Sequence, residues 1–451
     1  MKNICINNEI SILLVGIGGY GRNYVNALLP GEGLSGADDY EATLHNEQRL
    51  KCGPIKVVGA IDPAPSARGV AEARGIPLFD SLKDFYAEHQ ADLAILSTPI
   101  HLHCEQIKTC LANGSHVLCE KPLCATVDEA EEIRGAIADA GGRLHVWVGY
   151  QLSFSRSVRA LKDDILSGAF GKPIMLKTIV HYPRNEAYYA RNNWAGRKRT
   201  AGAAGRLVLD SPIHNAVSHH LNNMLFLLGD APDRAAKPVS VQAELYRGNP
   251  DVENFDTAAL RCITECGAPE RSAPDRMTPG RRVPVYFYTS HSLAHDGNIG
   301  PISQYRFECA TIVHTDEREH ESFFAFFDDG STRRYSLPYY DQMQKLWDCI
   351  GAIRGGPIPP SGVEAAAQEV ICTNGAQLSH PITTIPSEYV DRIGEPGQRF
   401  TEVAGLEEML FECFDRALLP SELNESRRPP WATPGKIVAQ QDIINIKSKI
   451  L

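Results

Sequence analysis

The pattern of apolar and polar residues differs between the first 150 residues and the rest of the chain. Over the first 150 residues, short apolar runs typical of buried strands alternate with longer amphipathic runs typical of helices. This alternation predicts an α/β domain built on a doubly wound parallel sheet. The predicted strands cover residues 12–16, 55–61, 93–97, 116–119 and 144–148, with a short one near Ile76, and the predicted helices cover 24–29, 64–74, 82–89, 104–113 and 127–140.

After residue 150 the pattern becomes richer in strands. Helices are predicted at 158–167 and 340–354, and between them lie predicted strands at 174–182, 239–246, 256–264, 283–290, 305–313, 323–327 and 332–336. Residues 267–282 are rich in proline and arginine and are predicted to form a surface loop. We expect three parts: residues 1–150, residues 151–380, and a proline-rich C-terminal extension at 381–451, an arm that wraps a neighbouring subunit or shields an active site.

The first predicted strand runs directly into the turn Gly16-Ile17-Gly18-Gly19-Tyr20-Gly21 and then into a helix. In such a turn the first glycine permits the bend, the second lets the backbone approach a pyrophosphate, and the last lets the helix pack on the strand. The N–H groups at the start of the helix can bind phosphate. This context predicts a dinucleotide site; a tight turn without a ligand is the alternative.

Asp62 ends the second long strand, where an acidic residue is expected to bind the ribose hydroxyls of an adenosine. An insertion at 30–53 roughly doubles the usual spacing from the glycine turn, and we expect it to be peripheral, as an oligomer contact. A carboxylate repels a 2′-phosphate, so NAD is favoured, although Arg68 lies close enough in sequence to keep NADP open. An ordinary turn residue is the alternative for Asp62.

Two later strands end in residues suited to the same site, because ligands bind at the carboxyl ends of strands in a doubly wound sheet. Thr98, Pro99 and His103 follow one strand, and Glu120-Lys121-Pro122 follows the next. A lysine there suits proton handling, because partial burial beside a nicotinamide favours its neutral form. A surface ion pair with Glu120 is the alternative for Lys121.

Taken together, the glycine turn, the Pro-x-x-x-His loop at 99–103 and the Glu-Lys-Pro motif at 120–122 resemble the glucose-fructose oxidoreductase, inositol dehydrogenase and rhizopine-catabolism family of NAD(P)-dependent sugar enzymes. The resemblance extends from residue 10 to about residue 380. It implies a Rossmann domain, then an α+β domain with a large, mostly antiparallel open sheet, and a homo-oligomer (dimer or tetramer) packed through the open face of that sheet. The cofactor-binding residues expected from the motifs and the resemblance are Gly16, Gly18, Gly19, Tyr20, Gly21, Asp62, Thr98, Pro99, His103, Glu120, Lys121 and Gln151.

Asp210 and His214 are four residues apart, one helical turn, so both side chains can point to one side of a helix start. With Lys121 they resemble the Lys, Asp and His constellation of the family. The resemblance implies that His214 is the general base for a substrate hydroxyl, that Lys121 holds that oxygen, and that Asp210 positions or polarises substrate or base. The alternatives are a helix N-cap for Asp210 and a core histidine for His214.

A segment from His181 to Arg199 mixes aromatic, amide and cationic side chains directly after a predicted strand. Aromatic rings stack on the apolar faces of sugars, amides bind hydroxyls, and arginine binds carboxylate, sulfonate or phosphate. We therefore predict a carbohydrate or polyol substrate, neutral or anionic, with a solvated loop as the alternative. The predicted substrate-binding residues are His181, Arg191, Asn192, Trp194 and Asn215, the last standing where the family often has aspartate.

Composition narrows the partners. The 451 residues are 43% hydrophobic and 22% charged, with a net charge of -10, which is typical of a globular protein and disfavours bulk binding to nucleic acid or an anionic membrane. The chain has no run of 18 apolar residues and no signal-sequence pattern, so we expect a cytoplasmic protein. The 12 cysteines lack metal-site spacing, so we expect buried thiols and no metal.

These expectations favour an NAD-dependent dehydrogenase that takes a hydride from a ring hydroxyl of a sugar, sugar acid or cyclitol. One alternative is an NAD-dependent glycosidase that oxidises its substrate transiently, eliminates across the glycosidic bond and returns the hydride. Another is a nucleotide-binding regulator without catalysis, against which Lys121, Asp210 and His214 argue. Net NADH production, glycoside cleavage without NADH, and NAD binding alone would distinguish the three.

Overall fold

A computed structural model of the chain describes residues 9–29, 47–202, 205–270, 273–295, 297–315, 322–339 and 342–445. Of the predicted insertion at 30–53, residues 30–46 lie outside this part of the chain. The chain divides into two compact units. The first contains residues 1–124, 129–155 and 339–363, and the second contains residues 125–128, 156–338 and 364–451.

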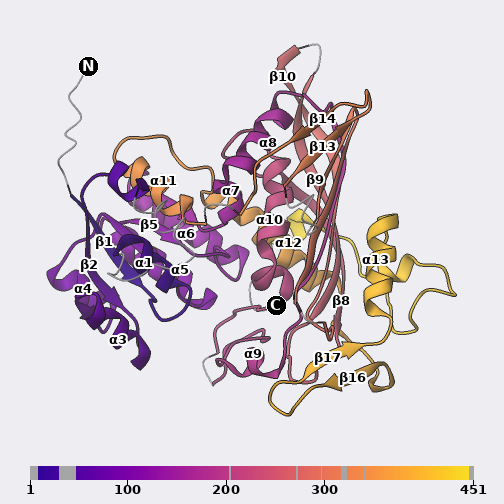
Figure 1. Ribbon diagram of the computed structural model, residues 1–451, viewed down its shortest axis with the longest axis horizontal. Helices are drawn as coiled ribbons and strands as arrows, with labels where there is room; N and C mark the ends of the chain where they lie inside the picture. Colours follow the sequence, from indigo (N-terminus) through magenta and orange to yellow (C-terminus); the bar gives the residue numbers. More distant parts are fainter. Residues whose placement is uncertain are drawn as a thin grey trace. The chain divides into compact units, whose positions relative to one another are not determined.

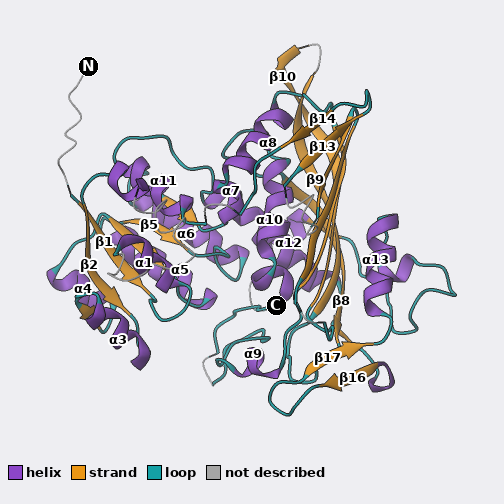
Figure 2. Cartoon of the chain, viewed as in Figure 1, coloured by secondary structure: helices purple, strands orange, loops and turns teal. Residues whose placement is uncertain are grey.

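The first unit is built on a six-stranded parallel sheet, as predicted (Figure 2). Its order, β3-β2-β1-β4-β5-β6, is that of a doubly wound sheet in which the chain moves outwards from β1 in both directions. The apolar strands fit this position, because parallel strands are buried on both faces. The strands are β1 (Ile10–Val15), β2 (Ile55–Ile61), β3 (Leu78–Phe79), β4 (Leu93–Leu96), β5 (His116–Cys119) and β6 (Val146–Val148), and the helices are α1 (Gly21–Leu28), α3 (Pro65–Ala73), α4 (Leu82–Glu88), α5 (Ile100–Ala112), α6 (Val127–Asp139) and α7 (Gln151–Phe154).

The first unit also includes α11 (Gln344–Ile353), although this helix follows the second sheet in sequence. Leu346, Trp347 and Ile350 of α11 are buried in the same hydrophobic core as Ile12 of β1. Their spacing places them on one face of the helix, within the helix predicted at 340–354. Residues 340–341 of that prediction lie outside the described residues.

The second unit contains a ten-stranded, mostly antiparallel sheet, which confirms the predicted α+β class. The strand order is β14-β13-β12-β11-β7-β10-β9-β8-β15, and β18 also pairs with β8. Only the pairs β7–β10 and β8–β15 are parallel in the part of the sheet that the structure describes. The strands are β7 (Pro173–His181), β8 (Lys237–Arg247), β9 (Thr257–Glu270), β10 (Ala273–Ser290), β11 (Ile299–Phe307), β12 (Ala310–His314), β13 (Phe324–Phe327), β14 (Thr332–Arg334), β15 (Thr383–Thr384) and β18 (Val438–Ala439).

Two predictions for this sheet, one of a loop and one of a strand, are wrong. Residues 267–282 were predicted as a surface loop, but residues 267–270 and 273–282 belong to β9 and β10, which pair as a long antiparallel hairpin; residues 271–272 lie outside the described residues. The weak strand preference of proline and arginine is outweighed here, because the antiparallel pairing of β9 with β10 continues from the preceding residues into this stretch. The predicted strand at 305–313 is two strands, β11 and β12, which pair with each other on either side of Glu308 and Cys309.

Helices cover one face of this sheet, and α13 (Leu406–Arg416) lies on the other (Figure 1). Alternate residues of β7 contact the two layers, as expected for a strand. The Thr178 hydroxyl contacts Met224 of α10, whereas Lys177 Nζ donates to the carbonyl oxygens of Phe414 and Asp415 at the end of α13. The helices of the unit are α8 (Arg156–Leu166), α9 (Glu186–Ala190), α10 (Ser218–Leu227), α12 (Val363–Ser379), α13 and α14 (Gln440–Asn445), with one π-helical turn, η1 (Pro212–Ala216), and two 3-10 turns, η2 (Ser387–Tyr389) and η3 (Pro420–Glu422).

The described part of the C-terminal extension packs on the sheet of its own chain. Leu406, Met409 and Leu410 of α13 are buried in one core with Ile179 of β7 and Tyr288 of β10. A hairpin of β16 (Val390–Ile393) and β17 (Phe400–Val403) precedes this helix. The homo-oligomer predicted through the open face stays a prediction, and α13 already covers part of that face over β7 and β10.

Among the described helices, none combines the length and the apolar character that crossing a membrane requires. Each cysteine in the described part of the chain is a free thiol, and most are buried. Packed in this way, cysteine acts as a small apolar side chain. This agrees with the prediction of buried thiols.

Candidate active site

The glycine turn between β1 and α1 fits a dinucleotide. Gly16 has a φ of +83°, and a Cβ at this residue would lie 2.6 Å from the carbonyl oxygen of Ser97. A Cβ on Gly21 would lie 1.8 Å from the carbonyl oxygen of Gly16, so only glycine lets α1 start this close to the strand. A Cβ on Gly19 would meet no described atom within 4 Å. The turn is therefore closed against the sheet and open at Gly19, which suits the approach of a pyrophosphate.

Asp62 follows β2 and lies against this turn despite the long insertion before it. Its carboxylate accepts hydrogen bonds of 2.8 Å from the N–H groups of Ile17, Gly18 and Ala64. A ribose can donate its hydroxyls to a carboxylate in this position, whereas a 2′-phosphate would be repelled. The residues present therefore fit NAD.

His103 of α5 joins the two later loops of the first unit. Its Nδ1 lies 2.8 Å from the carbonyl oxygen of Pro122, and its Nε2 lies 2.8 Å from that of Thr98. Burial lowers the pKa of His103, although both carbonyls oppose this effect. Pro99 caps the start of α5 between these groups. The imidazole thus ties the Thr98–Pro99 loop to the Glu-Lys-Pro loop, and both of its nitrogens are engaged.

Glu120 belongs to a buried polar network that the sequence did not reveal. Its Oε1 accepts hydrogen bonds from Tyr24 (2.6 Å) and from Nζ of Lys345, which is 1% exposed. Lys345 also lies 3.2 Å from the hydroxyl of Tyr20, in the glycine turn. Burial opposes the charged ammonium, but Glu120 and Tyr20 outweigh it and raise the pKa of Lys345. This ion pair fixes Glu120, the neighbour of half-buried Lys121, against the glycine turn.

Lys345 was not predicted from the sequence, because it lies on α11, far along the chain from the two loops that it contacts. Its only sequence signal is a lysine next to the apolar stripe of a helix, and most such lysines are exposed. Of the other predicted cofactor residues, Gln151 opens α7 at the end of the unit.

In the second unit, Asp210 is buried just before η1. Leu209, the preceding residue, has a φ of +48°, a conformation that costs a non-glycine residue energy and that surrounding structure must hold. The Asp210 carboxylate accepts hydrogen bonds from Gly196 N–H (2.6 Å) and Asn215 Nδ2 (2.7 Å). Burial raises the pKa of Asp210, and these bonds, with Arg191 and His214, oppose the rise. The helix N-cap is Ser211 rather than Asp210.

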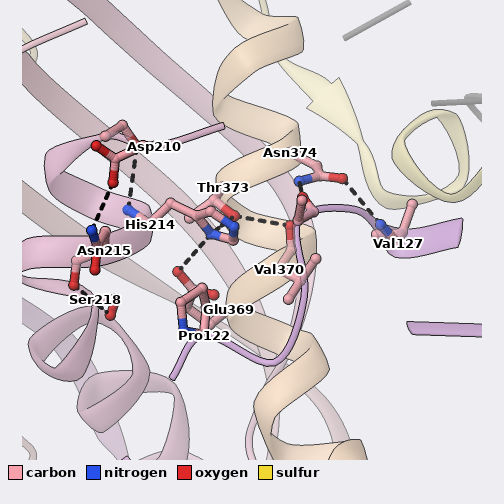
Figure 3. A network of polar contacts seen from close by, with 12 residues as sticks. Pro122, Val127, Asp210, His214, Asn215, Ser218, Glu369, Val370, Thr373 and Asn374 are labelled. Carbon is pink, nitrogen blue, oxygen red and sulfur yellow. Dashed lines mark hydrogen bonds and ion pairs between the residues drawn. The ribbon is translucent and has the colours of Figure 1, made fainter. Parts of the chain in front are cut away.

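His214 lies in η1 and is 1% exposed (Figure 3). Its Nδ1 lies 3.1 Å from Thr373 Oγ1 and 3.4 Å from Glu369 Oε1, both on α12. Its Nε2 is buried and has no hydrogen-bond partner among the described residues. A buried imidazole nitrogen without a partner is rare unless a ligand or water completes it. Nδ1 is therefore held by Thr373 and Glu369, whereas Nε2 has no partner in the described part of the chain, an arrangement that can serve a general base with an orienting carboxylate.

Neither Glu369 nor Thr373 was found from the sequence, because α12 itself was not predicted. The segment from Val363 to Ser379 is buried on nearly every side, so it shows no amphipathic stripe. Only the run of helix-forming residues, rich in alanine, could have signalled a helix there.

The predicted substrate segment divides over two environments. The Arg191 guanidinium lies 3.5 Å from the centre of the Tyr188 ring and 5.4 Å from that of Trp194. Asn192 closes a turn, because its Oδ1 accepts the N–H groups of Trp194 and Ala195. His181, the last residue of β7, is fully buried against Phe411 of α13, and burial lowers its pKa to about 3.

The described contacts therefore join Asp210 to Asn215, and Arg191 to Trp194, but leave His181 apart from His214. Arg191 opposes the rise in the pKa of Asp210, which indicates that the aromatic segment lies near the carboxylate.

Comparison with known proteins identifies the first unit. Residues 10–150 match the model of the GFO_IDH_MocA oxidoreductase family, described as an NAD-binding Rossmann fold. A 1,5-anhydro-D-fructose reductase of Ensifer adhaerens is 28% identical over 40% of this chain and 50% of its own length. The rhizopine catabolism protein MocA of Rhizobium meliloti is 26% identical over 44% of this chain and 57% of its own length. The match thus spans about half the length of these curated relatives.

Solved structures extend the similarity of fold over both units. The WlbA dehydrogenase from Bordetella pertussis, solved with NADH and UDP-GlcNAcA, superposes with a TM-score of 0.59 at 20% identity, covering 82% of this chain and 97% of that one. At this identity the likeness concerns the fold alone. Residues 10–150 of the chain are thus an NAD-binding Rossmann domain of the Gfo/Idh/MocA family of oxidoreductases.

Proposed function

We propose that the protein is an NAD-dependent dehydrogenase that oxidises a ring hydroxyl of a sugar, sugar acid or cyclitol. The observation that carries this proposal is His214, whose Nδ1 is held on α12 while its buried Nε2 lacks a partner among the described residues. The glycine turn and Asp62 support NAD as the cofactor, and the carboxylate favours NAD over NADP. The family relatives include an inositol 2-dehydrogenase of Rubrobacter xylanophilus, which supports a polyol or sugar hydroxyl.

In the proposed reaction, His214 Nε2 takes the proton of the substrate hydroxyl as its carbon becomes a carbonyl. Bound NAD supplies the acceptor for the hydride that leaves the same carbon. Glu369 orients the imidazole and stabilises the imidazolium that forms, because a carboxylate beside Nδ1 attracts the new charge. One proton thus goes to His214, and one hydride goes to the nicotinamide.

The proposal gives Asp210 and Lys121 supporting roles. Asp210 is buried and held by Gly196 and Asn215, so it presents a fixed polar group near His214. Lys121, next to the anchored Glu120, is proposed to bind the hydroxyl oxygen that loses its proton.

The decisive experiment incubates the purified protein with NAD and a panel of sugars, uronates, cyclitols and aryl glycosides, following NADH absorbance and released aglycone together. We expect NADH to form with at least one sugar or polyol. His214→Asn and Glu369→Gln should lower kcat by about 10²-fold or more, the usual contribution of a positioned general base. Glu364→Gln, on the exposed side of α12, is the matched control and should leave kcat unchanged.

Other outcomes would contradict a net dehydrogenase. Aglycone release that needs NAD but accumulates no NADH would make the protein a redox-assisted glycosidase. NAD binding without turnover of any compound would favour a regulator, and normal kcat in His214→Asn would remove the base assigned here.

A further inference from the structure

Two arginines surround one tyrosine beside the candidate active site. The guanidinium carbon of Arg184 lies 5.0 Å from the centre of the Tyr188 ring, and that of Arg191 lies 3.5 Å from the same centre. The Arg184 side chain is half-buried, and its Nε is fully buried without a hydrogen-bond partner among the described residues. Its Nη1 donates to the carbonyl oxygen of Pro183, at 3.2 Å. The buried Nε–H of this guanidinium is therefore an unsatisfied donor in the described part of the chain.

The acidic side chains nearby are committed to other partners. Glu186, two residues from Arg184, pairs with Arg392 at 2.5 Å and Arg399 at 3.1 Å and accepts the N–H of Gly397. Asp210 accepts the Gly196 N–H and the Asn215 amide. In the described part of the chain, neither Arg184 nor Arg191 has a carboxylate within ion-pair distance. No direct ion pair in this part of the chain therefore neutralises either guanidinium.

The pKa of His291 reflects the charges of both arginines. Burial, followed by Arg184, Arg191 and His181, lowers the pKa of His291 well below its ordinary value. The His291 ring is 4% exposed, and its Nδ1 lies 2.9 Å from the Tyr189 hydroxyl. The positive charges of Arg184 and Arg191 thus both act on the buried His291 ring, beside Tyr188 and Tyr189.

We propose that Arg184 and Arg191 form a subsite for the carboxylate of a sugar acid. Guanidinium groups bind carboxylates through paired N–H donors, and the Tyr188 ring holds both of them close together. A monoanion is favoured over a phosphate dianion, because the Asp210 carboxylate close to Arg191 would repel the second charge more strongly. This inference rests on the proposed function and narrows its substrate class to uronates and related sugar acids.

The test compares D-glucuronate with D-glucose and D-glucose 6-phosphate as substrates of the full chain with NAD. The wild type should prefer the acid. Arg184→Met and Arg191→Met should each lower the ratio of kcat/KM for acid over neutral sugar by about tenfold or more, the usual worth of a hydrogen bond to a charged group. The matched control is Arg416→Met, which removes an arginine from an exposed pair with Glu412 on α13 and should leave the ratio unchanged.

Binding separates this inference from the proposed function. Isothermal titration of glucuronate into the protein with NADH, which cannot accept a hydride, should show 1:1 binding that Arg191→Met loses and Arg191→Lys partly restores. If no sugar is oxidised but this binding holds, the subsite stands and the dehydrogenase does not. A ratio unchanged in both methionine variants, absent glucuronate binding, or stronger binding of the sugar phosphate would each overturn the subsite. Normal thermal unfolding of the variants would confirm that they fold.

Discussion

At the scale of single residues, Lys162 shows how burial makes stability depend on pH. The side chain is 1% exposed, and its Nζ donates to the carbonyl oxygens of Phe226 (2.7 Å) and Arg234 beyond the end of α10. Burial lowers the pKa of Lys162 from 10.5 to about 7. Between these two values the unfolded chain binds more protons than the folded protein, so the free energy of unfolding rises as pH rises.

Replacing this lysine should remove that pH dependence. Across pH 7.5 to 9.5, we expect wild-type stability to gain up to about 1.4 kcal/mol per pH unit relative to Lys162→Met. Urea unfolding at several pH values measures the difference. Lys237→Met removes an exposed lysine of β8 and should keep the wild-type slope. Equal slopes for wild type and Lys162→Met would show that the lysine keeps its proton in the folded state over this range.

At the scale of elements, the ion pair between Lys345 and Glu120 attaches α11 to the nucleotide loops. The two side chains are 1% and 10% exposed, with Nζ and Oε1 2.5 Å apart. Lys345→Met would leave Glu120 buried without its cation, and breaking a buried pair in this way costs about 3–5 kcal/mol. We expect a lower free energy of unfolding and weaker NAD binding, measured by denaturant unfolding and by titration of NAD.

A matched exposed pair provides the control for this prediction. Lys108 pairs with Glu132 at 2.7 Å on the surface of the same unit, and exposed pairs contribute at most about 1 kcal/mol. Lys108→Met should therefore change stability little and NAD binding not at all. If Lys345→Met behaved like Lys108→Met, the network would not hold the loops. Adding Glu120→Gln to Lys345→Met should recover part of the lost stability, because the buried charge is removed.

The elements also show what a sequence can and cannot predict. The β1 strand, its glycine turn and Asp62 were predicted because each depends on local pattern and on the order of strands in a doubly wound sheet. Glu369 was not, because it meets His214 only through tertiary packing of a helix without an amphipathic stripe. By contrast, α13 has buried Leu406, Met409, Leu410, Cys413 and Phe414 at helical spacing, a signal that its proline-rich surroundings obscured.

At the scale of the whole molecule, the C-terminal extension connects stability to the candidate substrate site. Its hairpin pairs with the segment that carries both arginines: Glu186 N–H donates to Arg399, and the Asn185 amide donates to Gln398. Its helix α13 packs on β7, the strand that leads into that segment, through Lys177 and Ile179. The extension thus contacts the segment at 181–199 through its hairpin, and the strand that precedes this segment through α13.

If the extension belongs to the core, deleting apolar atoms from α13 should destabilise the fold. Leu410 is fully buried in the cluster with Ile179 and Tyr288, and Leu→Ala changes in such positions cost about 2–5 kcal/mol through lost burial and the cavity that remains. We expect Leu410→Ala to lower the free energy of unfolding by this amount in denaturant titrations. Ile437→Ala, at a residue of the extension that is 69% exposed, should change it by less than about 0.5 kcal/mol. If both variants unfolded like the wild type, α13 would be a dispensable arm, and the support it gives to β7 and the arginine segment would have to come from the sheet alone.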